Sequence, residues 1–270
     1  MTATGSVGRL RRYTRLLGIF WRSTLAVELE YRVNFLSNAV MSIFWMAWAV
    51  VGAGVFFQFS DSIAGWTFGE LIVVIGLFFA VNGLRQALFE PNLERMTDYI
   101  RNGTLDFLLT KPVDTQFMVS FRYLGVYNLF DPVLGLAVAG GGLVSVGRWP
   151  RPADLGAFAV MFGVAVILLY ALTLVLMAAA IGLVNSDGLA SFAFAAVEVA
   201  RFPVQLYRQP IQTVLTVVPI AMLTTFPAQA LLGRLDAWAL LAGVATAVAA
   251  VTLASWRFRR ALRSYAGASG

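Results

Sequence analysis

The sequence predicts an all-α integral membrane protein with six transmembrane helices, an N-terminal amphipathic helix in the membrane interface and re-entrant helices before the last span. Of its 270 residues, 59% are hydrophobic and 13% are charged, and its mean hydropathy is +0.77. In an ordinary soluble domain about a quarter of the residues are charged. The apolar residues also gather in long blocks, each able to supply the roughly 20 residues that cross a bilayer.

Residues 1–32 are predicted to be a cytoplasmic N-terminus that contains the interfacial helix. From Leu10 onward, apolar side chains that include Leu17 and Phe20 fall on one face at the helical period. The opposite face carries Arg11, Arg12, Arg15 and Arg22. A basic amphipathic helix of this kind lies on a membrane surface. A calmodulin-type target helix or a nucleic-acid-binding arm is the alternative.

Residues 33–258 are predicted to form a single transmembrane domain, followed by a cytoplasmic tail at 259–270. The predicted spans are about 33–59, 68–88, 119–146, 155–184, 189–206 and 237–256. Short polar turns join most of these blocks. The exception is the loop at 90–116 between the second and third spans.

Four prolines interrupt the stretch that follows the start of the fifth span: Pro203, Pro210, Pro219 and Pro227. Proline inside a helix removes a hydrogen bond and kinks or breaks the helix. Non-helical backbone at membrane depth is tolerated where protein or a cavity surrounds it. We therefore predict broken, re-entrant helices at 207–232 on one membrane face, with a single proline-kinked span as the alternative.

The basic residues define the topology. Six spans put both termini on one side, and that side carries 15 of the 20 Lys and Arg residues. Because cytoplasmic loops are enriched in these residues, both termini and the loop at 90–116 are predicted to be cytoplasmic. The protein is expected to be a multi-pass protein of the cell membrane.

The loop at 90–116 is predicted to form two short amphipathic helices. The residues of the first helix and of the turn that ends it are Leu93, Met96, Ile100, Arg101 and Gly103. Those of the second helix and its closing Lys-Pro pair are Leu105, Asp106, Leu108, Leu109, Lys111 and Pro112. The apolar side chains would form an anchor, ringed by charge, for the groove of a partner protein. The alternative is that both helices rest on the inner leaflet or on the protein's own spans.

Charged residues inside the apolar blocks are the candidates for substrate or gating roles, because a charge at the membrane centre costs roughly 2.5–3.5 kcal/mol on insertion scales. Asp131, Glu198 and Arg201 are the clearest examples. Glu198 and Arg201 are three residues apart, so they can form an ion pair on one helix face. Asp131 can instead bond a neighbouring helix or the backbone freed at Pro132.

The composition excludes most catalytic chemistry. The chain has no Cys and no His, which removes thiolate and imidazole groups as nucleophiles, proton relays and metal ligands. The single lysine, Lys111, lies between Thr110 and Pro112, whereas a nucleotide-binding P-loop requires G-x-x-x-x-G-K-[ST]. The chain is therefore not expected to be an enzyme or to bind a metal.

Four segments carry a resemblance to a known family: GTLDFLLTKPV, RFPVQLY, VPIAMLTTFPAQALLG and WRFRRALRSY. Together they resemble the ABC-2-type permeases, in particular the six-span ABC-2 family transporter proteins, over essentially the whole chain. The resemblance implies a membrane subunit that pairs with a second permease and with two cytosolic ATPase subunits, which bind ATP and Mg, to export a substrate. It also implies that the N-terminal helix and the loop at 90–116 contact the ATPase, and that the broken helices form the extracytoplasmic gate.

An ATP-independent channel or an accessory assembly protein is the rival function. A channel would line several spans with polar residues at helical spacing, and the third, fourth and sixth blocks have almost none. The basic residues are assigned to membrane orientation, so no nucleic-acid partner is expected.

Overall fold

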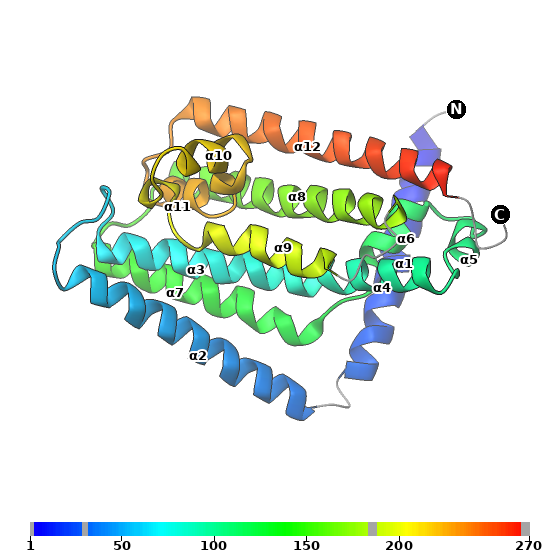
Figure 1. Ribbon diagram of the computed structural model, residues 1–270, viewed down its shortest axis with the longest axis horizontal. Helices are drawn as coiled ribbons and strands as arrows, with labels where there is room; N and C mark the ends of the chain where they lie inside the picture. Colours follow the sequence, from blue (N-terminus) through cyan, green and yellow to red (C-terminus); the bar gives the residue numbers. More distant parts are fainter. Residues whose placement is uncertain (1–2, 29–31, 183–187, 266–270) are drawn as a thin grey trace.

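A computed structural model describes residues 3–28, 32–182 and 188–265 (Figure 1). The described residues are mainly helical, and their β-pairing is one isolated bridge between Ile63 and Trp66. The α-helices are α1 (Ala3–Glu28), α2 (Arg32–Phe57), α3 (Phe68–Leu84), α4 (Glu90–Arg101), α5 (Asp106–Leu109), α6 (Thr115–Phe121), α7 (Phe130–Val146), α8 (Pro152–Gly182), α9 (Leu189–Glu198), α10 (Ile211–Val217), α11 (Thr225–Leu231) and α12 (Ala237–Ser264).

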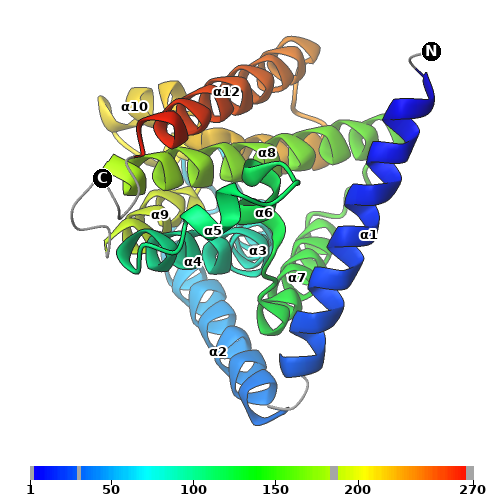
Figure 2. The same ribbon diagram turned by 90° about the vertical axis from the view of Figure 1, so that its right-hand side faces the viewer.

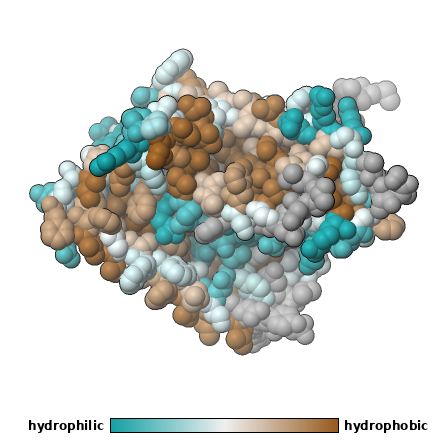
Figure 3. All heavy atoms as spheres, in the orientation of Figure 1, coloured by the Kyte–Doolittle hydropathy of each residue, from teal (hydrophilic) through white to brown (hydrophobic). Residues whose placement is uncertain are grey.

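The long helices α2, α3, α7, α8 and α12 run along the molecule, and α1 crosses one end of them (Figures 1 and 2). Five segments of the described chain are long and apolar enough to cross a membrane, and a bent pair, α10 with the segment to the end of α11, is a sixth candidate. Hydrophobic side chains cover much of the flank in Figure 3, with hydrophilic side chains toward its ends and in a smaller patch near its middle. This is the surface of a multi-pass membrane protein.

The segment predicted as the fifth span, 189–206, is not a single helix. The helix α9 has ten residues, and at about 1.5 Å per residue it covers about half of a hydrocarbon core roughly 30 Å thick. Two 3₁₀ turns, Val199–Arg201 and Val204–Leu206, continue the chain on either side of the extended Phe202. The helix is therefore interrupted before residue 207, where the re-entrant region was predicted to begin. Pro203 follows shortly after the first 3₁₀ turn, Val199–Arg201.

The helix of the second predicted span continues past residue 88. One helical segment of 34 residues runs from Phe68 to Arg101, with a π-helical turn at Arg85–Phe89 between α3 and α4. Pro91 lies at the start of α4, where proline commonly begins a separate helix, and the π turn instead lets the helix continue past it. The Ala87 carbonyl, which Pro91 cannot engage, accepts a hydrogen bond from the Gly125 N–H at 2.8 Å.

The third span begins later than the predicted residue 119. Helix α6 ends at Phe121, and the span-length segment begins at Val126. The Asn92 side chain is buried and holds the non-helical link between them, because its amide nitrogen donates to the Tyr123 carbonyl at 2.8 Å and its oxygen accepts from the Tyr123 N–H at 3.0 Å. Residues before the break therefore belong with the loop at 90–116.

Glycines allow close backbone contact between α3 and α7. A Cβ atom added to Gly76 would lie 2.5 Å from the Gly135 carbonyl oxygen and 2.5 Å from the Ala139 nitrogen. One helical repeat further along, a Cβ atom on Gly83 would lie 2.5 Å from the Cβ atom of Asp131. Small residues at such positions permit backbone contact between membrane helices. The close packing of α3 and α7 fixes the position of Asp131 relative to α3.

Candidate functional site

At one end of the molecule α4, α5 and α6 form a compact group beside α1 (Figure 2). We call the group of α4, α5 and α6 the end module. A left-handed turn at Gly103, with φ of 64°, reverses the chain between α4 and α5. Four of the predicted anchor residues are buried within the protein itself: Leu93, Met96, Leu105 and Leu108. They share one cluster with Phe258 of α12 and Met177 of α8. These four side chains therefore pack on the protein's own spans, as the alternative interpretation has it, and contact of the loop with a partner stays a prediction.

The exposed apolar residue of α5 is Phe107, with 71% of its surface accessible, followed by Leu109 with 38%. Phe107 was not among the predicted residues. Helical spacing could have identified it, since Leu105 and Leu108 are three apart and share a face from which Phe107 points away. Of the other predicted residues, Arg101, Lys111 and Pro112 are exposed, and Ile100, Gly103 and Asp106 are half-buried.

Charged and aromatic side chains fix the end of α4. The hydroxyl groups of Tyr99 and Tyr123 hydrogen-bond at 2.8 Å. The guanidinium groups of Arg95 and Arg122 each lie 5.4 Å from the centre of the Tyr123 ring, a favourable distance for cation–π attraction. Arg101 is paired with Asp98 at 2.9 Å. These contacts tie α4 to the link before α7, so α4 and that link form one unit.

Helix α1 packs directly on the end module. The Arg12 guanidinium donates to the Pro112 carbonyl at 2.9 Å, and the Trp21 indole N–H donates to the Phe121 carbonyl at 3.3 Å. The ring of Tyr13 meets that of Phe117 edge-on, with centroids 4.6 Å apart. The predicted faces are present: Leu17 and Phe20 are half-buried, whereas Arg11, Arg12, Arg15 and Arg22 are exposed.

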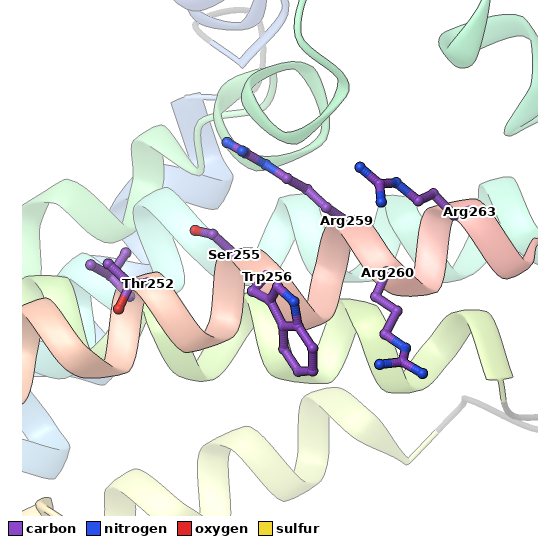
Figure 4. A pocket seen from close by; sticks show the side chains of 7 residues that line it. Thr252, Ser255, Trp256, Arg259, Arg260 and Arg263 are labelled. Carbon is purple, nitrogen blue, oxygen red and sulfur yellow. The ribbon is translucent and has the colours of Figure 1, made fainter.

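The C-terminal end of α12 also meets this group. Burial and the nearby Asp106 carboxylate raise the pKa of Tyr265. Beside it, a basic hollow of about 650 Å³ follows α12 (Figure 4). Its labelled side chains are Thr252, Ser255, Trp256, Arg259, Arg260 and Arg263. The Arg260 guanidinium lies 5.5 Å from the centre of the Trp256 ring. Arginine beside tryptophan at a helix end is typical of a membrane interface.

The three charged residues predicted inside the apolar blocks, Asp131, Glu198 and Arg201, line one cavity of about 370 Å³, which we call the polar cavity. The predicted ion pair between Glu198 and Arg201 is confirmed. The remaining lining residues come from α2, α3 and the π turn: Asn38, Met41, Ser42, Trp45, Phe78, Phe79, Asn82 and Gln86. Among the residues that the structure describes, no group of three or more acidic side chains is placed to hold a metal ion.

The predicted gate prolines lie at or near the opposite end of the molecule, around α10 and α11 (Figure 1). Pro210 precedes α10, and Pro219 lies at the 68° bend between the two halves of the bent pair. Pro227 does not break a helix, because it lies in the first turn of α11, where no intrahelical N–H bond is lost. At this end Arg234 pairs with the buried Glu70 at the start of α3, at 2.5 Å.

The sequence profile of the ABC-2 family transporter proteins matches residues 43–269. Neither a search of curated proteins nor a search of solved structures finds a significant match. The profile covers α3 to α12 and most of α2. It therefore includes the whole end module and the residues of the polar cavity from Trp45 onward, and it does not include α1. The chain therefore belongs to the family of ABC-2 family transporter proteins.

Proposed function

We propose that this chain, which as a member of this family is a permease component of an ABC transporter, is the membrane subunit of an exporter in the cell membrane, with both termini in the cytoplasm. The family implies association with ABC ATPase subunits. ATP and Mg bind to the partner ATPases, and this chain supplies no cofactor site. A second permease, identical or different, completes the substrate pathway.

The exposed Phe107 on a firmly held α5 carries this proposal. Aromatic residues, Phe included, are enriched in protein interfaces, and Phe107 has 71% of its surface exposed. Leu105 and Leu108, on either side of it, are 0% and 4% exposed. Because its neighbours are buried, movement of Phe107 would be transmitted directly to the buried cluster beneath α5.

The contacts of the end module give the direction of transmission. Its cluster includes Phe258 of α12 and Leu174 of α8, both fully buried. Helix α1 adds a second connection through Arg12 and Trp21. Close-packed groups of this kind move as rigid bodies between discrete arrangements. ATP-driven closure of the ATPases would thereby switch the spans between inward-open and outward-open states, with the region 207–232 as the outer gate.

Retention of the ATPase by the purified permease tests the proposal. The chain is expressed with the ATPase subunit encoded beside it, extracted in mild detergent and purified by a tag on the permease. We expect Phe107→Asp to reduce the retained ATPase at least tenfold, because loss of one buried aromatic anchor costs about 2 kcal/mol or more and each 1.4 kcal/mol is about a factor of ten.

Phe59→Asp is the matched control, because Phe59 is 87% exposed in the turn after α2, at the other end of the molecule. This variant is expected to retain the ATPase as the wild type does. If the wild-type chain retains no ATPase, the exporter proposal fails and the ATP-independent channel or assembly protein takes its place. If Phe107→Asp retains it fully, the docking surface is not α5.

A further inference from the structure

The polar cavity has more negative than positive charge. Its ionisable side chains are Asp131, Glu198 and Arg201. Glu198 and Arg201 neutralise each other in their ion pair, and the Arg201 guanidinium also lies 5.2 Å from the centre of the Phe78 ring. With all three groups ionised, one negative charge remains. That charge belongs to Asp131.

Asp131 has no cationic partner among the described residues. It is 7% exposed, and its Oδ1 atom makes no hydrogen bond. Ser42 of α2 lies near its carboxyl group and lines the polar cavity with it. A buried carboxylate without a counter-charge is unfavourable in an apolar environment. Its position is also held firmly, because Gly83 of α3 lies against its Cβ atom.

The walls of the polar cavity suit an organic cation. Phe78, Phe79 and Trp45 supply aromatic surface, and Met41 supplies an adaptable thioether side chain. Aromatic faces attract cations and also cover apolar groups. Trp45 is 53% exposed, so it stands at an open side of the polar cavity. A volume of about 370 Å³ is within the range of small-molecule sites, roughly 300–1,000 Å³.

A second hollow adjoins the polar cavity. It has a volume of about 350 Å³, shares Asn38 and Met41 with the polar cavity, and extends to Tyr127 and Asn128 at the start of the third span. The Asn38 amide donates to the Asn128 side-chain oxygen at 3.0 Å. Amide and hydroxyl groups of this kind can solvate a charged group on its way inward.

We propose that the polar cavity binds a lipophilic organic cation, with its ammonium group against the Asp131 carboxylate and its apolar body against Trp45 and Phe79. This deepens the proposed function by naming the chemical class of its substrate, and it rests on that function only for the transport step. Binding itself requires no ATPase. The cation supplies the positive charge that no described side chain provides next to Asp131.

Isothermal titration calorimetry on the full chain in lipid nanodiscs tests the proposal, with the heat of empty nanodiscs subtracted. The probes are 1-naphthylmethylammonium and 1-naphthylmethanol, which share a ring system and differ in charge. We expect the ammonium compound to bind at least tenfold more tightly than the alcohol. Asp131→Asn should abolish this preference and leave the affinity for the alcohol unchanged.

A variant of opposite sign separates charge from misfolding. Arg201→Gln raises the negative charge of the polar cavity and should strengthen ammonium binding several-fold, a gain that damage to the fold would not produce. Asp61→Asn, in an exposed turn outside the polar cavity, is the matched control and should behave as the wild type. Equal affinities of the wild type for both probes, or a preference that survives Asp131→Asn, would overturn the proposal. Because the assay contains no ATPase, either result leaves the exporter proposal to its own test.

Discussion

Replacing Gly76 by Ala tests whether α3 and α7 touch through their backbones. In a helix interior Ala is about 1 kcal/mol more favourable than Gly, so the substitution alone would stabilise the protein. At Gly76, however, the new Cβ atom would lie 2.5, 2.5 and 2.9 Å from backbone atoms of Gly135 and Ala139. Backbone atoms cannot rotate aside as a side chain can. The two helices must therefore separate by about 1 Å, which forfeits a quarter to a half of each contact's attraction.

The two effects have opposite signs, and their sizes decide the result. Overpacking costs about 1–3 kcal/mol, and we place this site at about 3 kcal/mol because every clashing atom belongs to a helix backbone. After subtraction of the gain of about 1 kcal/mol from helix propensity, Gly76→Ala should destabilise the protein by about 2 kcal/mol. At Gly141 of α7, by contrast, a Cβ atom would meet no described atom within 4 Å, so Gly141→Ala should stabilise by up to about 1 kcal/mol.

Unfolding in mixed micelles, followed by far-ultraviolet circular dichroism against the fraction of denaturing detergent, measures both variants on one scale. The predicted gap between them is about 3 kcal/mol, larger than the usual scatter of about 0.5 kcal/mol for surface substitutions. If Gly76→Ala stabilises the protein as much as Gly141→Ala does, the close contact between α3 and α7 is refuted.

Three further substitutions test other contacts by the same unfolding measurement. Asn92→Leu removes three hydrogen bonds and leaves the Tyr123 backbone groups unpaired, so a loss of about 3 kcal/mol is expected; a loss below about 1 kcal/mol would mean that water replaces the amide. Arg234→Met leaves the buried Glu70 carboxylate without its cationic partner and should destabilise the protein by about 2 kcal/mol. This is less than the roughly 3–5 kcal/mol for breaking a fully buried pair, because Arg234 is partly exposed. Adding Glu70→Gln to this variant should recover part of the lost stability, and no recovery would contradict the pairing. Asp236→Ala removes the carboxylate that accepts the Ala239 N–H at the start of α12 and should cost about 1 kcal/mol, whereas Asp236→Asn, which keeps a capping oxygen, should cost less.

Local sequence signals predicted the fold class and the two faces of α1 correctly, because each depends on composition or on helical spacing within one segment. The continuation of α3 into α4 depends on a distant residue. Pro91 signals a helix break, and the structure avoids the break because Gly125 takes up the Ala87 carbonyl. No pattern around Pro91 reveals that partner.

The candidate sites show the same limit. The spacing of Glu198 and Arg201 predicted their ion pair, because side chains three residues apart on a helix are close enough to interact. The meeting of Asp131 with Glu198 in one cavity is a property of how separate helices pack, and the sequence distance between them carries no sign of it. Likewise, the apolar residues Leu105 and Leu108 suggested a partner's groove, and their partner is the protein's own core.

The length of the helix from Phe68 to Arg101 can serve as a reference distance within the protein. Its 34 residues span about 51 Å at 1.5 Å per residue, from the Arg234 contact at one end to the end module at the other. The chain has no cysteine, so a pair of introduced cysteines flanking this helix would carry the only spin labels in the protein. Their separation gives a reference length against which other label pairs can be read.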